Sequence, residues 1–283
     1  MHKKYINDDV FIKWKELKNA VDNAEKPELL IAGSSHGACG IIGSVIAYNS
    51  LNICFDSIDL YLTNKLAQYY INKFGSVKTL IITYSLFSNS YELERIKGIR
   101  SILDGLEVFL NIKGRKKYTL KDRLRICGVK DYKRNFIDTI NADSKYREIN
   151  GDQKELQPYD APAATETVNN HIKHYKRNIS QNIYVEKLLE FCLEKGIEVS
   201  IVITPVRDDY KKIVMQECDM DNLFMDIKNI CTKYKNAHLL SYFLSEEFTP
   251  DEYRDADHIN MKGAKKLSNF IKYDIEKFYG NSK

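Results

Sequence analysis

Five short apolar blocks, separated by segments with helical periodicity, constrain the fold of this chain more than any other feature. They lie at Leu29–Ala32, Asn52–Phe55, Thr79–Tyr84, Val199–Thr204 and His238–Tyr242. Strands that are buried on both faces are continuous apolar runs, because helices cover both sides of a parallel sheet. The blocks therefore predict an α/β fold, a three-layer αβα sandwich around a five-stranded parallel sheet.

Helix boundaries lie between these blocks. Apolar residues recur at helical spacing over Ile183–Leu193, and Gly196 then provides a helix stop before the next strand. Near the C-terminus, Asn260 is a plausible N-cap, and an apolar stripe follows it over Leu267–Phe278. The chain thus has the alternation of strands and helices that is typical of βαβ units.

One segment, at about residues 92–177, breaks this alternation. It is longer than a crossover connection needs and is rich in charged and turn residues. We predict a single domain over residues 1–283 with a mainly helical insertion in this segment. Its basic run, Lys113–Arg125, indicates either a solvated helix face or a contact with an acidic substrate or polyanion. Near the end of the insertion, Gln157–Asn170 is predicted to be an irregular loop.

The composition limits the class of protein. Of 283 residues, 43% are apolar and 29% charged, which is typical of a globular chain. The net charge of +4 is low for a nucleic-acid-binding protein, and we expect no such partner. No apolar run is long enough to span a membrane, and polar residues interrupt the N-terminal segment before a secretory signal could form. Six scattered cysteines without a CxxC pair suggest reduced thiols, hence a cytoplasmic location, and neither a metal nor a cofactor is expected. The oligomeric state stays open.

The stretch "LLIAGSSHGACG", Leu29–Gly40, joins the first predicted strand to a helix. In an open parallel sheet, ligands bind at the carboxyl ends of the strands, so Ser34, Ser35 and His36 are expected there. Amide groups in a first helical turn have no intrahelical partner and can stabilise an anion. A serine in that turn is therefore a candidate nucleophile whose own amide contributes to an oxyanion site.

Two other interpretations of this stretch stay open. The first is a tight turn with capping serines. The second is a nucleotide-binding loop, because Gly33, Gly37 and Gly40, with Asp56 after the second strand, loosely imitate a dinucleotide site. The spacing departs from G-x-G-x-x-G, and the chain contains no P-loop motif.

The stretch "DADH", Asp255–His258, follows the fifth predicted strand and precedes the terminal helix. This position puts His258 at the same sheet edge as Ser35. Asp255 stands three residues before the histidine, a spacing that can place its carboxylate on one imidazole nitrogen while the other faces a serine. Asp257 is an alternative orienting acid, and a polar capping loop is the alternative to catalysis.

These residues resemble motifs of the SGNH, or GDSL, hydrolase superfamily. "GSS", Gly33–Ser35, resembles the family's G-D-S block, and "DADH" resembles its D-x-x-H block. More narrowly, "LLIAGSSHGACGI", "SLNICFDSIDLY", "IVITPV" and "DADHINMKGAKKLS" are similar to bacterial SGNH-like proteins associated with cell-surface polysaccharides and their acylation. The resemblance implies a flavodoxin-like SGNH fold, with Ser35 as nucleophile, His258 as base and Asp255 as the acid that orients it.

The chain departs from the family pattern at three places. Ser34 replaces the aspartate that precedes the family's serine. The oxyanion glycine of the second block has no clear match, and Asn52 and Ser57 lie in the corresponding region. The third block, G-x-N-D, is replaced by "YSLFSN", which offers Ser85 and Asn89. The candidate oxyanion-hole residues are Ser35, Asn52, Ser85 and Asn89.

The sequence thus predicts a serine-dependent acyl transfer enzyme, an esterase or O-acyltransferase acting on short O-acyl groups of a carbohydrate. A helical insertion could supply the lid that transfer to an acceptor other than water requires. Because two oxyanion blocks are missing, a non-catalytic carbohydrate- or partner-binding module on the same fold is the main alternative. A nucleotide-binding protein is the third.

Overall fold

The structure is a computed structural model, and it describes the chain at residues 8–96, 100–136, 161–176 and 180–280. The chain divides into two compact units. The smaller consists of Met1–Ala24 and Glu92–Arg147, and the larger of Glu25–Tyr91 and Glu148–Lys283. The single domain with an insertion at about residues 92–177 stays a prediction, and residues 97–99, 137–160 and 177 of that segment lie outside the described part.

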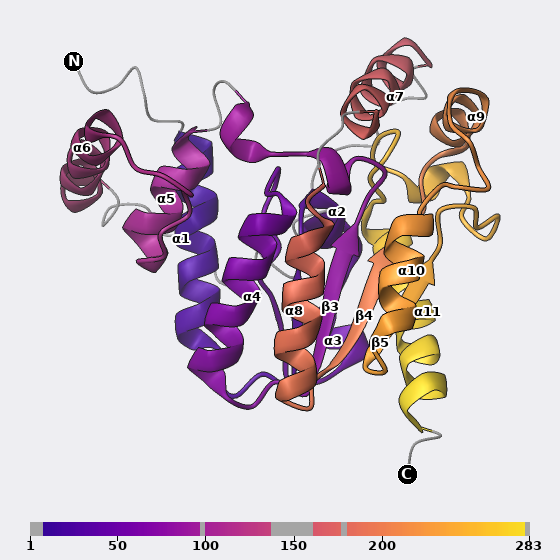
Figure 1. Ribbon diagram of the computed structural model, residues 1–283, viewed down its shortest axis with the longest axis horizontal. Coiled ribbons are helices and arrows are strands. Elements are labelled where there is room, and N and C mark those ends of the chain that lie inside the picture. The colour runs from indigo at the N-terminus through magenta and orange to yellow at the C-terminus, as the bar shows by residue number, and fades with distance from the viewer. Residues whose placement is uncertain (1–7, 97–99, 137–160, 177–179, 281–283) are drawn as a thin grey trace. The chain divides into compact units, whose positions relative to one another are not determined.

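The larger unit contains one sheet, whose strands are all parallel (Figure 1). The strands are β1 (Leu29–Ala32), β2 (Ser50–Asn52), β3 (Thr79–Tyr84), β4 (Glu198–Ile203) and β5 (Ala237–Ser241). Their order is β2-β1-β3-β4-β5, which confirms the predicted five-stranded parallel sheet and gives it the flavodoxin-like order.

The second predicted strand, Asn52–Phe55, overlaps β2 at one residue only. The regular ladder stops because the Cys54 amide donates to the Asn52 side chain, at 2.9 Å. The Phe55 amide still reaches the Gly33 carbonyl, at 2.9 Å. The loop after β2 is therefore tied to the loop after β1.

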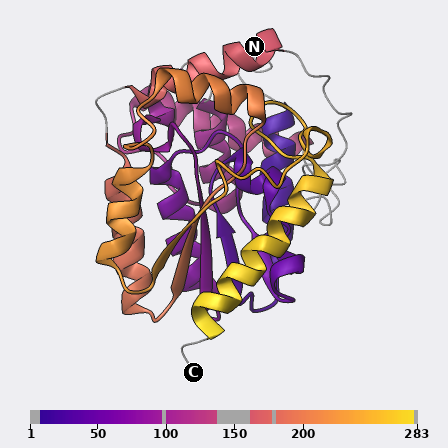
Figure 2. The same ribbon diagram turned by 90° about the vertical axis from the view of Figure 1, so that its right-hand side faces the viewer.

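Helices cover both faces of the sheet (Figures 1 and 2). On one face lie α4 (Leu60–Phe74), α8 (Asn182–Glu194) and α10 (Met225–Lys233). On the other lie α2 (Ser35–Gly40), α3 (Gly43–Ile46) and α11 (Met261–Gly280), of which α11 crosses the sheet face in Figure 2. This arrangement confirms the three-layer αβα sandwich.

The C-terminal helix begins where the sequence predicts. The Asn260 side chain accepts a hydrogen bond from the Gly263 amide, at 3.2 Å, as an N-cap does. Leu267 and Ile271, one turn apart, are fully buried against the sheet. No helix in the described ranges has the length and apolar character to cross a membrane.

Two further helices of the larger unit, α7 (Ala161–Tyr175) and α9 (Asp208–Glu217), contact each other and lie beyond the carboxyl ends of the strands (Figure 1). The prediction of an irregular loop was wrong from Ala161 onward, and residues 157–160 lie outside the described part. Ala164, Val168 and Ile172, spaced four apart, form one buried stripe that stabilises α7. Pro162 lies in the first turn, where a helix tolerates proline.

The smaller unit consists of α1 (Asp8–Asn23), α5 (Arg100–Leu110) and α6 (Leu120–Phe136). It also contains a short 3-10 helix, Leu93–Arg95, whereas the 3-10 helices Ser88–Ser90 and Pro250–Glu252 belong to the larger unit. The basic run is not uniformly solvated. Arg115 and Arg125 donate to the buried Asp104, at 2.8 and 2.5 Å, whereas Lys121 and Arg123 are exposed.

Candidate active site

The turn from β1 into α2 places two serines at the carboxyl edge of the sheet. β1 lies between β2 and β3, so this edge is the point where the chain turns to opposite sides of β1. Ligands of open α/β sheets bind at such a switch point. Gly33 has a φ of 142°, and a Cβ there would lie 2.0 Å from Thr83 Oγ1. Glycine is therefore required for the sharp turn that starts α2 at Ser35.

A second loop, between β5 and α11, folds back on itself. Tyr253 pairs with Ile259, and the Arg254 amide donates to the His258 carbonyl at 2.9 Å. The His258 amide in turn donates to Asp255 Oδ1, at 2.8 Å. The three-residue spacing of "DADH" thus closes a turn that holds the Asp255 carboxylate beside the imidazole.

These two loops bring together the three residues that the sequence singles out as a triad. Ser35 Oγ lies 2.8 Å from His258 Nε2. His258 Nδ1 lies 2.9 and 3.1 Å from the two carboxylate oxygens of Asp255. The Arg254 guanidinium bonds Asp255 Oδ2, at 3.2 Å, and fixes the carboxylate from the other side. The geometry is that of a serine, a base and an orienting acid in one hydrogen-bonded chain.

A second hydrogen-bonded chain lies beside the first. His36 Nδ1 is 2.9 Å from Ser85 Oγ, and His36 Nε2 is 3.1 Å from Asp257 Oδ2. All three residues are buried. The rings of His36 and His258 are 4.8 Å apart, centroid to centroid.

Asp257 links these two hydrogen-bonded rows of side chains. Its Oδ1 lies 3.4 Å from His258 Nδ1, so the carboxylate that bonds His36 also faces the base of the first chain. The sequence offers Asp257 as an alternative orienting acid and gives His36 no role beyond the edge of the sheet. Both directly adjoin predicted site residues, Ser35 and His258, and this adjacency is the one signal by which they could have been found.

A third histidine reaches this cluster from α7. His171 Nδ1 lies 2.9 Å from the Tyr210 hydroxyl on α9 and 4.0 Å from Asp257 Oδ2. The Phe87 ring packs against it, with centroids 4.3 Å apart. The segment predicted to be a helical insertion therefore contributes a side chain beside the proposed triad.

The charges of this cluster shift the pKa values of its members. Burial lowers the pKa of His258, but the carboxylates of Asp257 and Asp255 outweigh burial and raise it well above its usual value. Burial raises the pKa of Asp257, yet His258 and His36 hold it well below its usual range. Asp255 behaves in the same way: its hydrogen bond to His258 overcomes burial and lowers its pKa. Each of the two carboxylates thus favours the charged form of His258, and His258 favours the charged form of each carboxylate.

His171 differs from His258. Burial lowers its pKa to about 4, and the attraction of Asp257 offsets this only in part. His171 is therefore neutral at neutral pH, and its pKa is shifted in the opposite direction to that of His258.

Two predicted oxyanion donors are engaged elsewhere. The Asn52 amide donates to the carbonyls of Gly37 and Ile41, at 3.0 and 3.1 Å, and so holds α2. Asn89 Oδ1 accepts from the Asn182 amide at the start of α8, at 3.0 Å, and its amide group donates to Asp226, at 3.3 Å. Both of these side chains thus hold other segments of the fold in place, and we build the proposed site without Asn52 and Asn89.

The loop after β2 offers a backbone donor instead. Ser57 has a φ of 60°, in the left-handed region that favours glycine. The Tyr91 hydroxyl donates to its carbonyl, at 3.1 Å, and stabilises this conformation. Within the described residues, no acceptor is found for the Ser57 amide. Ser57 is one of the two residues, with Asn52, that lie in the region corresponding to the second block of the resemblance.

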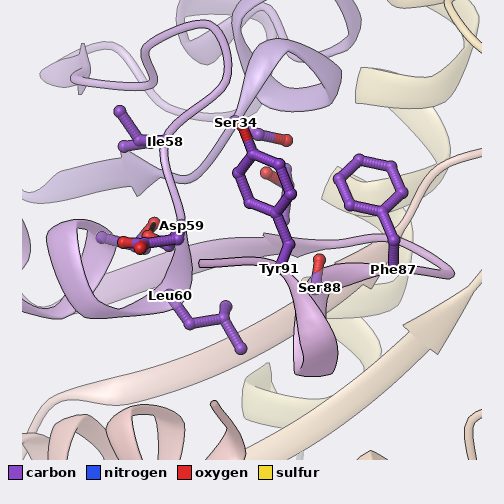
Figure 3. A pocket seen from close by; sticks show the side chains of 9 residues that line it. Ser34, Ile58, Asp59, Leu60, Phe87, Ser88 and Tyr91 are labelled. Carbon is purple, nitrogen blue, oxygen red and sulfur yellow. Dashed lines mark hydrogen bonds between the residues drawn. The ribbon is translucent and has the colours of Figure 1, made fainter. Parts of the chain in front are cut away.

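A small pocket adjoins these loops (Figure 3). Its wall includes Ser34, Ile58, Leu60, Thr83, Phe87 and Tyr91. In Figure 3 the Tyr91 ring points toward Ser34, the residue before Ser35. The pocket therefore lies next to the proposed nucleophile.

The cluster also has the residue types of a metal site. In the described ranges, His36, Asp257 and His258 form the one group of three or more such side chains close enough to hold an ion. Their facing atoms already bond each other at 3.1 and 3.4 Å, so we interpret the group as a proton network. Gly37 of the imitated dinucleotide loop serves packing, because a Cβ there would lie 2.4 Å from Cys54 Sγ.

No protein-family model and no curated protein matches the chain. Among solved structures, a Streptococcus pneumonia protein provisionally described as a platelet activating factor is 11% identical, with a TM-score of 0.45, and the alignment covers 95% of this chain and 92% of that one. A Corynascus thermopiles (Myceliophthora fergusii) carbohydrate esterase family 2 enzyme with a carbohydrate-binding domain is 10% identical, with a TM-score of 0.45 and coverage of 91% and 68%. A Bacteroides fragilis protein provisionally described as an acylhydrolase is 10% identical, with a TM-score of 0.43 and coverage of 94% and 97%.

Proposed function

We propose that the chain is a serine-dependent acyl transfer enzyme of SGNH type, an esterase or O-acyltransferase that acts on an O-acyl carbohydrate. One observation carries the proposal: Ser35, His258 and Asp255 form a continuous hydrogen-bonded chain at the switch point of the sheet. An activated nucleophile needs a base within hydrogen-bond distance and a third group that orients the base. The three residues meet that requirement.

In the first half-reaction, neutral His258 accepts the Ser35 hydroxyl proton as the oxygen attacks the acyl carbonyl. Asp255 keeps the imidazole in the tautomer whose Nε2 is free to accept. The tetrahedral intermediate collapses as His258 gives the proton to the leaving alkoxide, and the acyl group stays on Ser35. In the second half-reaction, water or a sugar hydroxyl loses its proton to His258 as its oxygen attacks the acyl carbon, and His258 returns that proton to the departing Ser35 oxygen, which restores both residues.

The negative charge on the tetrahedral oxygen needs hydrogen-bond donors. The backbone amides of Ser35 and Ser57 are our candidates, because Ser35 begins a helix and the Ser57 amide has no acceptor among the described residues. The Ser85 hydroxyl, which His36 holds in place, is a third candidate. A missing oxyanion donor typically lowers the rate by about a hundredfold or more, so this set decides how fast the enzyme is.

The carbohydrate substrate rests on the sequence resemblance. The choice between hydrolysis and transfer depends on whether the acceptor site excludes water. His171 on α7 contacts Tyr210 on α9 and Phe87 in the loop after β3, and it faces Asp257 of the cluster, so these helices are our candidates for the cover of the acceptor site.

The test is hydrolysis of 4-nitrophenyl acetate by the purified chain. We expect turnover that depends on Ser35 and His258, and no change in melting temperature with millimolar NAD or nucleoside diphosphate. The opposite result, nucleotide stabilisation that Asp56→Ala weakens together with acetate turnover unaffected by Ser35→Ala, would favour the nucleotide-binding alternative. Carbohydrate binding without Ser35-dependent turnover of any ester would favour the non-catalytic module.

A further inference from the structure

The helix α6 of the smaller unit carries apolar side chains on its outer face as well as on its inner one. It packs on α5, and Ile126 and Val129 are its buried residues (Figure 1). Leu120 and Leu124 lie one turn apart on the opposite face and are 74% and 66% exposed. Cys127, three positions further and also exposed, continues this apolar stripe. Exposed apolar residues that share one helix face, unlike a single exposed leucine, indicate an interaction surface.

The segment around the apolar stripe is strongly basic. Residues 113–130 contain eight lysine and arginine residues and one acidic residue, Asp122, a net charge of +7, whereas the whole chain carries +4. The remainder of the chain is therefore net acidic. Asp122 itself bonds Arg125, at 3.2 Å. Positive charge thus gathers on one short segment, as it does in proteins that bind an anionic surface.

Only part of this charge is used inside the smaller unit. Arg115 and Arg125 bond the buried Asp104, and Lys116 pairs with Glu92 at 3.0 Å. The other basic side chains of residues 113–130 are exposed and have no ion-pair partner in the described part of the chain; they are Lys113, Lys117, Lys121, Arg123 and Lys130. These five cations are available to an external anion.

The cations and the apolar stripe share the outer face of α6. At helical periodicity, Lys121 and Arg123 lie on opposite sides of the leucines. The headgroup layer of an anionic bilayer offers phosphates to such cations and, just below them, an apolar phase to the leucines. We propose that this face of α6 binds the surface of a membrane rich in anionic phospholipids, with Leu120 and Leu124 inserted at the level of the headgroups.

Two other occupants fit this face less well. A soluble polyanion would pair with the cations but would leave the leucines in water. A second copy of the chain, docked through the same face, would bring like charges together. The anionic membrane surface is the occupant that satisfies both the cations and the apolar stripe. This inference concerns the smaller unit and goes beyond the proposed function, which is assigned to Ser35 in the larger one.

The experiment is co-sedimentation of the full chain with lipid vesicles. The chain should bind vesicles made of equal parts of phosphatidylcholine and phosphatidylglycerol. Binding should be at least about tenfold weaker with phosphatidylcholine alone, because the attraction to the anionic surface is lost. Raising the salt concentration to about 1 M should weaken binding to the mixed vesicles in the same way, because salt screens that attraction.

Two double variants separate the apolar and the ionic contributions. Leu120→Ser with Leu124→Ser should lower the partition coefficient on the mixed vesicles about tenfold or more, because two apolar side chains are lost. Lys121→Glu with Arg123→Glu should lower it by a similar or larger factor. All four positions are exposed, so circular dichroism and the melting temperature should stay those of the wild-type chain.

Matched controls come from the larger unit. Leu244→Ser changes a leucine that is 55% exposed, and Lys265→Glu with Lys272→Glu reverses two exposed charges of α11. Both controls should bind vesicles as the wild-type chain does. Controls that weaken binding as much as the α6 variants would overturn the assignment of the surface.

Three further outcomes would overturn the proposal. The first is a wild-type chain that does not bind the mixed vesicles. The second is binding that is lost in the charge variant and unchanged in the leucine variant, which would favour a soluble polyanion as the occupant. The third is a dimer, detected by light scattering, that Leu124→Ser dissociates while vesicles are not bound. Ser35-dependent ester turnover in solution should be the same in all these variants, so the proposed function is tested separately.

Discussion

Two serine–histidine–aspartate chains lie side by side at the carboxyl edge of the sheet, and they differ in exposure and in the direction of the imidazole. In the first, Ser35 bonds Nε2 of His258 and the acid bonds Nδ1. In the second, Ser85 bonds Nδ1 of His36 and the acid bonds Nε2. Ser35 is half-exposed, whereas Ser85 is buried.

We infer from this comparison that the same three residue types have different roles in different surroundings. A nucleophile must meet its substrate, so the half-exposed Ser35 at a helix start suits attack on an ester. The buried His36 fixes the positions of Asp257 and Ser85 in the interior, where unpaired polar groups are costly. The first chain is thus our candidate for the chemistry, and the second is a support for it.

The largest expected effect separates the two serines. Ser35→Ala should lower kcat/KM for 4-nitrophenyl acetate by about a thousandfold or more, because the nucleophile is lost. Ser85→Ala should lower it by about a hundredfold at most, the effect of removing one oxyanion donor. Steady-state kinetics of both variants, with circular dichroism to check folding, measure the difference. Equal losses of kcat/KM in the two variants would show that Ser35 and Ser85 do not differ in role.

The histidines should follow with a smaller contrast. His258→Gln removes the base and should lower kcat by about a thousandfold. His36→Gln retains hydrogen-bonding groups in the buried position, so we expect about a tenfold loss in kcat and a lower melting temperature. If His36→Gln abolished turnover while His258→Gln retained it, the assignment of the base would have to be reversed.

The smallest expected effect is a change in pH dependence. The base must be neutral, and the pKa of His258 is raised, so activity should increase with pH through a value above 6.5. Asp257→Asn removes one of the two carboxylates that raise this pKa, while Asp255 still faces the imidazole and Arg254, His36 and His171 stay nearby. The rising limb of the kcat profile should then move to lower pH by about one unit. A limb that stays in place or moves to higher pH would show that Asp257 does not act on His258.

The fold was predictable wherever the signal was local. β1 and β3 match their apolar runs residue for residue, because a buried parallel strand needs a continuous apolar segment. The β2 strand was misplaced because the Asn52 side chain, and not hydrophobicity, ends the ladder. The helix α7 was missed because its buried residues, Ala164, Val168 and Ile172, are separated by polar residues and give only a weak apolar pattern. The packing of these three side chains stabilises the helix, and a sequence does not reveal that packing.

The site was predictable to the extent that it lies in two short motifs. Asp255 and His258 share one turn, so their spacing reveals their contact. The roles of Asn52 and Asn89 depend on carbonyl and amide groups of other segments, which a sequence does not reveal. Asp257 and His36 are 221 positions apart, and only the fold brings them together.

The central claim is that Ser35 is the activated serine of this chain. Labelling with a fluorophosphonate probe, followed by peptide mass mapping, tests it without knowledge of the substrate. The account predicts one modified residue, Ser35, with labelling lost in Ser35→Ala, strongly slowed in His258→Gln and retained in Ser85→Ala. Modification at Ser34 or Ser85, or labelling that survives Ser35→Ala, would contradict it.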